Sequence, residues 1–110
     1  MPFYLFQGAY NNNQIKALVD TPSNRTQAGR ELMESFGGKL HQWFMAFGEW
    51  DLVGIIEFPD NETAAAAIMR LASSNVFGRA QTTVLFTPEE AEHAMRRANT
   101  TPTSYRPPLG

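Results

Sequence analysis

Four short segments of the chain have the hydrophobic pattern of β-strands. They lie at residues 2–10, 39–47, 52–58 and 80–86, and each is bounded by glycine, proline or a polar cluster. In the first and third segments, apolar residues occupy both alternating sets of positions, so both faces of these strands are apolar. Such strands belong at the centre of a sheet, because neither face tolerates contact with water.

Segments with helical periodicity lie between these strands and after the last one. Apolar residues recur at intervals of three or four over 22–36 and 61–74, and helix-forming sequence also occupies 14–20 and 88–98. Pro22 at a first helical position divides the first helical region into two short helices. The predicted order is therefore strand, helix, strand, strand, helix, strand, with one more helix after the last strand.

This order predicts an α+β fold of the ferredoxin-like βαββαβ kind, with one antiparallel sheet, helices on a single face, and an additional C-terminal helix. Right-handed crossovers place the first and third strands in the middle, which agrees with their two apolar faces. Residues 1–98 form the predicted domain. Residues 99–110 contain three prolines and no hydrophobic period, so we expect an extended tail there.

The face of the sheet without helices is predicted to be too apolar to stay exposed. We expect it to carry at least part of one aromatic and aliphatic set, namely Tyr4, Phe6, Trp43, Met45, Val53 and Ile55. A large exposed apolar patch is unfavourable on a monomer. The economical cover is the same face of a second copy across a twofold axis, burying about 800 Å² on each partner. We therefore predict a homo-oligomer with facing sheets.

Composition restricts the partners and the compartment. Eleven acidic and nine basic residues, without a basic cluster, argue against nucleic acid and anionic membranes as partners. The sequence has no cysteine, no signal-peptide pattern and no apolar run near the ~20 residues that span a bilayer. We expect a soluble, cytoplasmic protein. Because no phosphate-binding glycine loop or metal-ligand spacing occurs, we expect neither a cofactor nor a metal.

Several short motifs resemble the GYD domain family. They are Met1-Pro2 with Tyr4, Gly37-Gly38-Lys39-Leu40, the turn Gly48-Glu49-Trp50-Asp51 running into Leu52-Val53, Glu57 with Pro59-Asp60, and Thr82-Thr83. The resemblance covers most of residues 1–92 and implies a small bacterial protein of the dimeric α/β-barrel group, a family of largely uncharacterised function. Trp50 stands where the family usually has tyrosine, so a role for that phenolic hydroxyl is not implied here.

Five residues are candidates for a ligand site: Tyr4, His41, Trp43, Asp51 and Glu57. They combine aromatic surfaces with a histidine and two acids. Their arrangement depends on the hairpin between the second and third strands. A three-residue turn at 48–50, which we prefer, pairs His41 with Glu57 and also Trp43 with Ile55. A two-residue turn sends the two sets to opposite faces.

Three functions are compatible with this pattern. The leading hypothesis is a homo-oligomeric domain that holds a small apolar or aromatic molecule in a cavity with a few polar groups. One alternative is a cofactor-independent enzyme like the monooxygenases, isomerases and dehydratases of the same barrel type, with His41 or Glu57 as base. The other is a structural interaction module whose tail binds a neighbour. In the simplest case the aromatic residues form a dry oligomer core with a polar rim.

Overall fold

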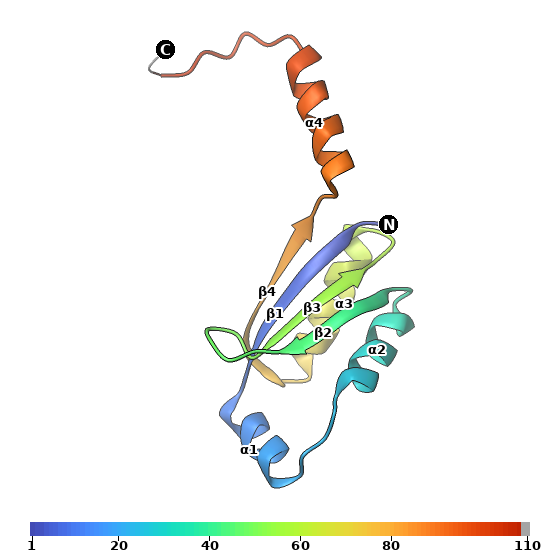
Figure 1. The fold of residues 1–110 in the computed structure, drawn as a ribbon, viewed down its shortest axis with the longest axis vertical. Coiled ribbons are helices and arrows are strands. Elements are labelled where there is room, and N and C mark those ends of the chain that lie inside the picture. The colour runs from blue at the N-terminus through green and yellow to red at the C-terminus, as the bar shows by residue number, and fades with distance from the viewer. Residues whose placement is uncertain (109–110) are drawn as a thin grey trace.

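The computed structural model describes residues 1–108, which form one four-stranded sheet with four helices (Figure 1). The elements along the chain are β1 (Phe3–Tyr10), α1 (Asn12–Asp20), α2 (Thr26–Ser35), β2 (Lys39–Met45), β3 (Leu52–Glu57), α3 (Asn61–Ser73), β4 (Phe77–Leu85) and α4 (Pro88–Thr100). The split of the first helical region is confirmed, but the second helix begins at Thr26 rather than at Pro22. Positions 109–110 of the predicted tail lie outside the described residues.

The sheet has the strand order β2-β3-β1-β4, and all neighbouring strands are antiparallel. β1 and β3, the two strands with apolar residues on both faces, therefore lie in the centre, as right-handed crossovers require. In Figure 1, α3 lies behind the strands, and α2 packs beside it on the same side. This arrangement confirms the predicted α+β, ferredoxin-like fold.

The hydrophobic core lies between the sheet and these helices. Along β1 and β3 every second residue is buried, because alternate side chains point to the same face of a strand. On α3 the buried residues are alanines, which allows a close approach of the helix to the sheet. The core consists of Tyr4, Phe6, Met33, Leu40, Leu52, Ile56, Phe58, Ala64 and Ala67.

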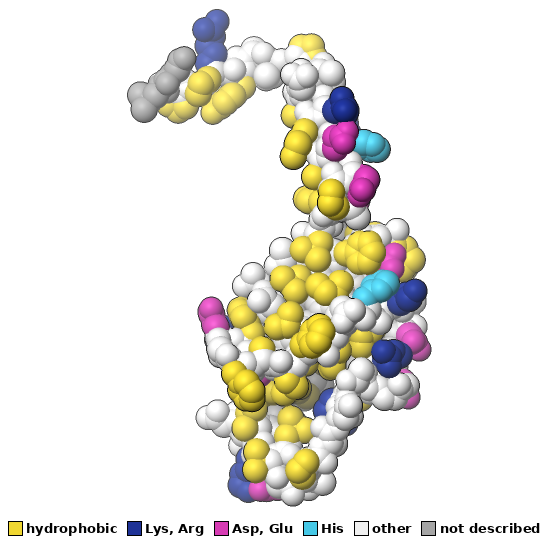
Figure 2. Space-filling view, in the orientation of Figure 1, with side chains coloured by type: hydrophobic (Ala, Val, Ile, Leu, Met, Phe, Trp, Pro, Cys, Tyr) yellow, Lys and Arg dark blue, Asp and Glu magenta, His cyan; other side chains and the backbone are white. Residues whose placement is uncertain are grey.

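The other face of the sheet, here called the open face, is also apolar but carries a different set of residues from the predicted one. Tyr4, Phe6 and Trp43 pack on the helix side, whereas Val53 and Ile55 lie on the open face. The apolar residues of the open face are Phe3, Leu5, Phe44, Val53, Ile55 and Leu85, and polar side chains of Gln7, Gln42, Gln81 and Thr83 share the face with them. Figure 2 shows hydrophobic side chains gathered across this side of the sheet.

The reason for this difference is the composition of β1. Phe3 and Leu5 alternate with Tyr4 and Phe6, so both sets of positions are equally apolar. Alternation alone therefore does not tell which set faces the helices. The structure buries Tyr4 and Phe6, at 2% and 0% exposed, and leaves the other pair on the open face.

A β-bulge at His41 sets the register between β2 and β3. Glu57 pairs with Lys39, and not with His41 as predicted, because His41 is the extra residue between two paired positions. In such a bulge two residues of one strand oppose one residue of its neighbour, so side-chain alternation shifts by one position. His41 consequently lies on the open face beside Glu57, although the two are not a paired position.

The hairpin turn is also longer than predicted. The backbone N–H of Ala46 donates to the carbonyl of Asp51 at 2.8 Å, which leaves residues 47–50 as the loop. Trp43 pairs with Gly54, and not with the predicted Ile55. Trp43 therefore faces the helices, on the opposite side of the sheet from His41.

A glycine cap connects α2 to β2. Gly37 has φ 75°, in the left-handed region that glycine tolerates best. Its N–H donates to the carbonyl of Glu34, and the N–H of Gly38 donates to that of Met33, both at 2.9 Å. These two bonds form a Schellman motif. They fix how α2 packs on the sheet beside Trp43.

The last helix extends away from the rest of the chain. α4 lies beyond the end of β4 in Figure 1, and none of its residues is buried. The radius of gyration is 18.0 Å, compared with about 13 Å for a compact chain of this length. α4 runs to Thr100, so the predicted tail start at 99 falls inside the helix. There the hydroxyl of Thr100 donates to the carbonyl of Arg96 at 3.0 Å.

No helix within residues 1–108 combines the length and the apolar character needed to cross a membrane.

Candidate functional site

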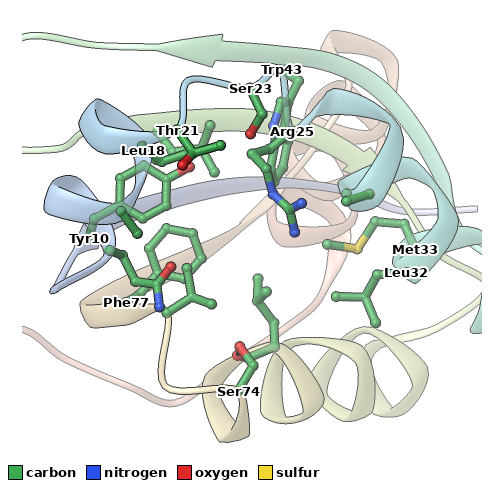
Figure 3. A pocket seen from close by; sticks show the side chains of 17 residues that line it. Tyr10, Leu18, Thr21, Ser23, Arg25, Leu32, Met33, Trp43, Ser74 and Phe77 are labelled. Atoms are coloured by element: carbon green, nitrogen blue, oxygen red, sulfur yellow. Dashed lines mark hydrogen bonds between the residues drawn. The ribbon is translucent and has the colours of Figure 1, made fainter.

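A cavity of about 510 Å³ lies between α1, α2, α3 and the sheet, and is here called the helix-side cavity (Figure 3). Its volume falls in the usual range for small-molecule sites, about 300–1,000 Å³. Side chains from all three helices, from all four strands and from the loops around them line it. The larger apolar ones are Leu18, Leu32, Met33, Trp43, Leu52, Leu71, Val76 and Phe77.

Trp43 forms part of the cavity wall because two glycines leave room for its indole ring. A β-carbon added to Gly54 would lie 2.7 Å from the ring, and one added to Gly29 would lie 3.1 Å from it. The ring of Phe6 stacks nearly parallel to the indole, with centroids 6.3 Å apart and an interplanar angle of 8°. Contacts from β1, β3 and α2 therefore hold the indole in one place.

Tyr10 and Phe77 form a second aromatic pair at the cavity. Their rings stack with centroids 4.9 Å apart. Burial raises the pKa of the Tyr10 phenol, the charge of Arg25 opposes this, and the charge of Asp51 adds to it. The phenol is therefore protonated at neutral pH and can donate a hydrogen bond to a bound molecule.

The polar groups of the cavity gather near the segment between α1 and α2. This segment contributes Thr21, Ser23 and Arg25, and Gln14 and Ser74 add further polar side chains. Arg25 is the one charged side chain that lines the cavity in the described part of the chain. Figure 3 shows its guanidinium pointing into the space between Tyr10 and Met33. A neighbouring hollow of about 390 Å³ shares Tyr10, Arg25 and Trp43 with the cavity.

The five predicted site residues are not brought together. Within residues 1–108, Trp43 is the member of that set that lines the helix-side cavity. Tyr4 is buried in the core, Asp51 lies at the start of β3, and His41 and Glu57 lie on the open face. The bulge at His41 separates Trp43 from His41 and Glu57, because the alternation of β2 shifts there and Trp43 faces the helices.

Tyr4 connects the sheet to the start of α3. Its hydroxyl donates a hydrogen bond to Oδ1 of Asn61 at 2.6 Å. Burial raises the pKa of the Tyr4 phenol, and the charge of Asp60 raises it further. A folded-state pKa above the unfolded value means that the contribution to stability is complete below about pH 10, the unfolded pKa, and is lost as pH rises through the folded pKa.

We expect Tyr4→Phe to lower the free energy of unfolding at pH 7 by about 1 kcal/mol, because one buried hydrogen bond is lost. The difference from wild type should shrink above pH 10, because the Tyr4 phenol, which the variant lacks, ionises more readily in the unfolded chain. Urea unfolding at both pH values measures this. Tyr105→Phe, in the exposed tail, is the control and should match wild type. A gap that widens at high pH would contradict the expectation.

His41 and Glu57 form a hydrogen-bonded pair on the open face. Nε2 of His41 lies 2.7 Å from Oε1 of Glu57, and both side chains are partly exposed. The ring of Phe3 lies against the imidazole, with centroids 5.4 Å apart. A histidine and a carboxylate in contact can move a proton. On this face the pair borders the apolar surface rather than the helix-side cavity.

Asp51, just before β3, is hydrogen-bonded to β1. Its Oδ2 accepts a hydrogen bond from the backbone N–H of Tyr10 at 2.9 Å, and its own N–H donates to the carbonyl of Gly8 at 2.9 Å. The side chain therefore satisfies a backbone donor at the end of β1, which is a common use of aspartate next to a turn. It also keeps Tyr10 in place at the cavity.

Sequence reasoning missed Tyr10 and Arg25 as site residues. A signal for Tyr10 was available, because it continues the even-numbered positions of Tyr4 and Phe6 along β1. Arg25 had no comparable signal, since a single arginine in a polar segment usually lies in solvent. Residues 1–108 contain no group of three histidine, aspartate or glutamate side chains placed to hold a metal ion.

The sequence model of the GYD domain family matches residues 4–95. The chain belongs to the GYD domain family. One relative of this GYD domain is a protein of Thermus thermophilus, named glutamine synthetase and cystathionine beta-lyase binding protein. The two are 27% identical over 73 residues, which cover 66% of this chain and 77% of the relative.

Solved structures similar to this GYD domain share its fold. FFRP-DM1 aligns with a TM-score of 0.52 at 11% identity, over 78% of this chain and 100% of that one. Protein Atu4242 of Agrobacterium tumefaciens aligns with a TM-score of 0.50 at 19% identity, over 80% and 98%. Both are of the dimeric α/β-barrel type. The predicted similarity to that fold type is confirmed.

In this GYD domain the tryptophan of the turn interacts with β4. The guanidinium carbon of Arg79 lies 4.4 Å from the centroid of the Trp50 ring, which is a cation–π contact. Nη2 of Arg79 also donates to the backbone carbonyl of Glu49 at 2.7 Å. The turn is therefore held to the sheet through Arg79, without a phenolic hydroxyl at position 50.

Proposed function

We propose that this GYD domain binds a small apolar or aromatic molecule in the helix-side cavity, and that it does so as a homodimer. The observation that carries the proposal is the cavity itself, which joins a ligand-sized volume to a largely apolar lining with a few polar groups. Trp43 and the Tyr10–Phe77 pair offer aromatic surfaces to a flat ligand.

The open face supports the homodimer. Six of its residues are apolar, and Phe44 is 60% exposed in a single chain. Burial of a patch this apolar against a second copy is favourable at about 25 cal/mol per Å² of apolar surface. A twofold arrangement is self-complementary, so one apolar face is enough to form it. The typically dimeric fold family agrees with this arrangement.

A cavity-filling variant tests ligand binding. Ala28 on α2 lines the cavity, so we expect Ala28→Phe to occupy the ligand's space and abolish binding of naphthol, used as a neutral aromatic probe. In wild type, naphthol at 100 times its Kd should stabilise the fold by about 2.7 kcal/mol and raise Tm by several degrees. Thermal unfolding followed by circular dichroism, with and without naphthol, measures the difference.

Ala65→Phe is the matched control. It makes the same change at an exposed position of α3, and the response to naphthol should equal that of wild type. The proposal fails if naphthol does not raise the Tm of wild type, or if it raises the Tm of Ala28→Phe equally. Native mass spectrometry of the purified protein adds a direct search for a bound small molecule.

A second candidate function is protein binding through α4. Ala91, Ala94, Met95 and Ala98 form an apolar stripe at helical spacing, and Met95 is 68% exposed. The name of the Thermus thermophilus relative reports binding to two enzymes. Calorimetric titration of purified glutamine synthetase and cystathionine beta-lyase against this protein tests the candidate, which fails if neither enzyme binds.

The enzyme alternative has less support. A base at His41 or Glu57 would need an aromatic substrate stacked on Trp43 and Tyr4, and those rings lie on the other side of the sheet. Proton transfer requires the base within hydrogen-bond distance of the substrate.

A further inference from the structure

We propose that the molecule held in the helix-side cavity is a carboxylate with an apolar body, and that Arg25 binds its carboxylate group. This inference rests on the proposed function and adds the chemical class of the ligand. Three features support it. Within residues 1–108 the side chain of Arg25 is unpaired, the groups around it can donate hydrogen bonds, and the rest of the cavity lining is mostly apolar.

Arg25 has no partner of its own among residues 1–108. Within residues 1–108, no carboxylate lies within 4.0 Å of its guanidinium, and its side chain makes no hydrogen bond. Arg79 and Arg96 each form an ion pair, with Glu49 and Glu92. Arg25 instead points into the cavity, where its five N–H donors are available to a ligand.

The surroundings of Arg25 favour a negative charge. No acidic side chain lines the helix-side cavity in the described part of the chain, so Arg25 is the charged group of its lining, and the negative charge nearby is that of Asp51, which acts on Tyr10. Arg25 is exposed to solvent at the mouth of the cavity, so water partly screens its attraction for a charged group. Tyr10, whose pKa is raised, is protonated and adds a neutral donor, and the hydroxyls of Thr21 and Ser23 lie along the same wall.

The geometry of the donors and the lining together define the ligand class. A guanidinium is planar and binds a carboxylate through two parallel hydrogen bonds. The rest of the lining is aliphatic or aromatic, which suits an apolar body and leaves few partners for a sugar or another polyhydroxylated group. With a single cation, the cavity matches one negative charge better than the two charges of a phosphate monoester.

Two probes of nearly equal shape separate the charge from the apolar body. Naphthylacetate carries a carboxylate, and naphthylacetamide replaces it with a neutral amide. We expect wild type to bind naphthylacetate at least about tenfold more tightly in calorimetric titration, because hydrogen bonds to charged groups are the stronger kind. Arg25→Gln should reduce the affinity for naphthylacetate to that for naphthylacetamide, and leave the amide unaffected.

Arg30→Gln is the matched control, because it removes the same charge from α2 at a position that does not line the cavity. It should retain the preference for naphthylacetate. If wild type binds the two probes with equal affinity, the carboxylate inference is overturned but the proposed function is not. The same holds if Arg25→Gln loses affinity equally for both probes. Tighter binding of naphthyl phosphate than of naphthylacetate overturns the carboxylate assignment. Failure of wild type to bind either naphthyl probe overturns the inference and the proposed function together.

Discussion

Replacing Ile55 with glutamate is expected to convert the protein from a dimer to a monomer. Ile55 lies in the middle of the open face, on central strand β3 and next to Leu5 of β1. In a twofold interface the substitution introduces two carboxylates that face an apolar surface and lie near each other. Like charges in such a position cost several kcal/mol, which corresponds to more than about a hundredfold increase in Kd.

Sedimentation equilibrium measures this effect as a change in mass. Wild type should have twice the 12.3 kDa of one chain, and Ile55→Glu should approach the single-chain mass. Met69→Glu provides the control, because Met69 is 70% exposed on α3, on the helix side of the sheet. A wild type that is monomeric at micromolar concentration contradicts the proposed homodimer. Circular dichroism confirms that each variant is folded.

The second large effect is expected for Gly54→Ala, which should lower the free energy of unfolding by about 1–3 kcal/mol. The added β-carbon would lie 2.7 Å from Cε3 of Trp43 and 2.9 Å from Cζ3. The indole is stacked on Phe6 and in contact with α2, so it has little room to move except toward the helix-side cavity. The variant should therefore also bind naphthol more weakly than wild type.

Gly48→Ala makes the same chemical change without a clash. No atom lies within 4 Å of the added β-carbon, and the φ of Gly48 is not positive. Its free energy of unfolding should equal that of wild type or exceed it by up to about 1 kcal/mol, because alanine restricts the unfolded chain. Urea unfolding of the three proteins gives the comparison. If the two variants were equally stable, the close packing of Trp43 against Gly54 would not be important for stability.

The fold was predictable because local signals agree with one another. Two strands with apolar residues on both faces, short connections and caps at Asp60 and Thr87 allow few topologies. Both caps are formed in the structure, where Asp60 accepts from the N–H of Thr63 at 2.7 Å and Thr87 accepts from that of Glu90 at 3.1 Å. These signals act within a few residues and therefore appear directly in the sequence.

The candidate site was less predictable because it depends on one inserted residue and on contacts between distant segments. A bulge at His41 has no distinctive residue type, yet it decides which side of the sheet Trp43 occupies. The position of Arg25 beside Tyr10 depends on how α1 and α2 are connected. Periodicity identifies the faces of individual elements but does not measure how three helices close over a sheet.

The bulge also has a consequence for how sequence change can act on this protein. Because β2 shifts its alternation at residue 41, one short strand serves two chemically independent surfaces, with His41 on one and Trp43 on the other. Substitutions at the β2 positions on the open face and at those facing the helices can therefore accumulate under separate selective pressures. One surface can diverge while the other is preserved, so the proposed self-association could change without a change in the proposed ligand binding.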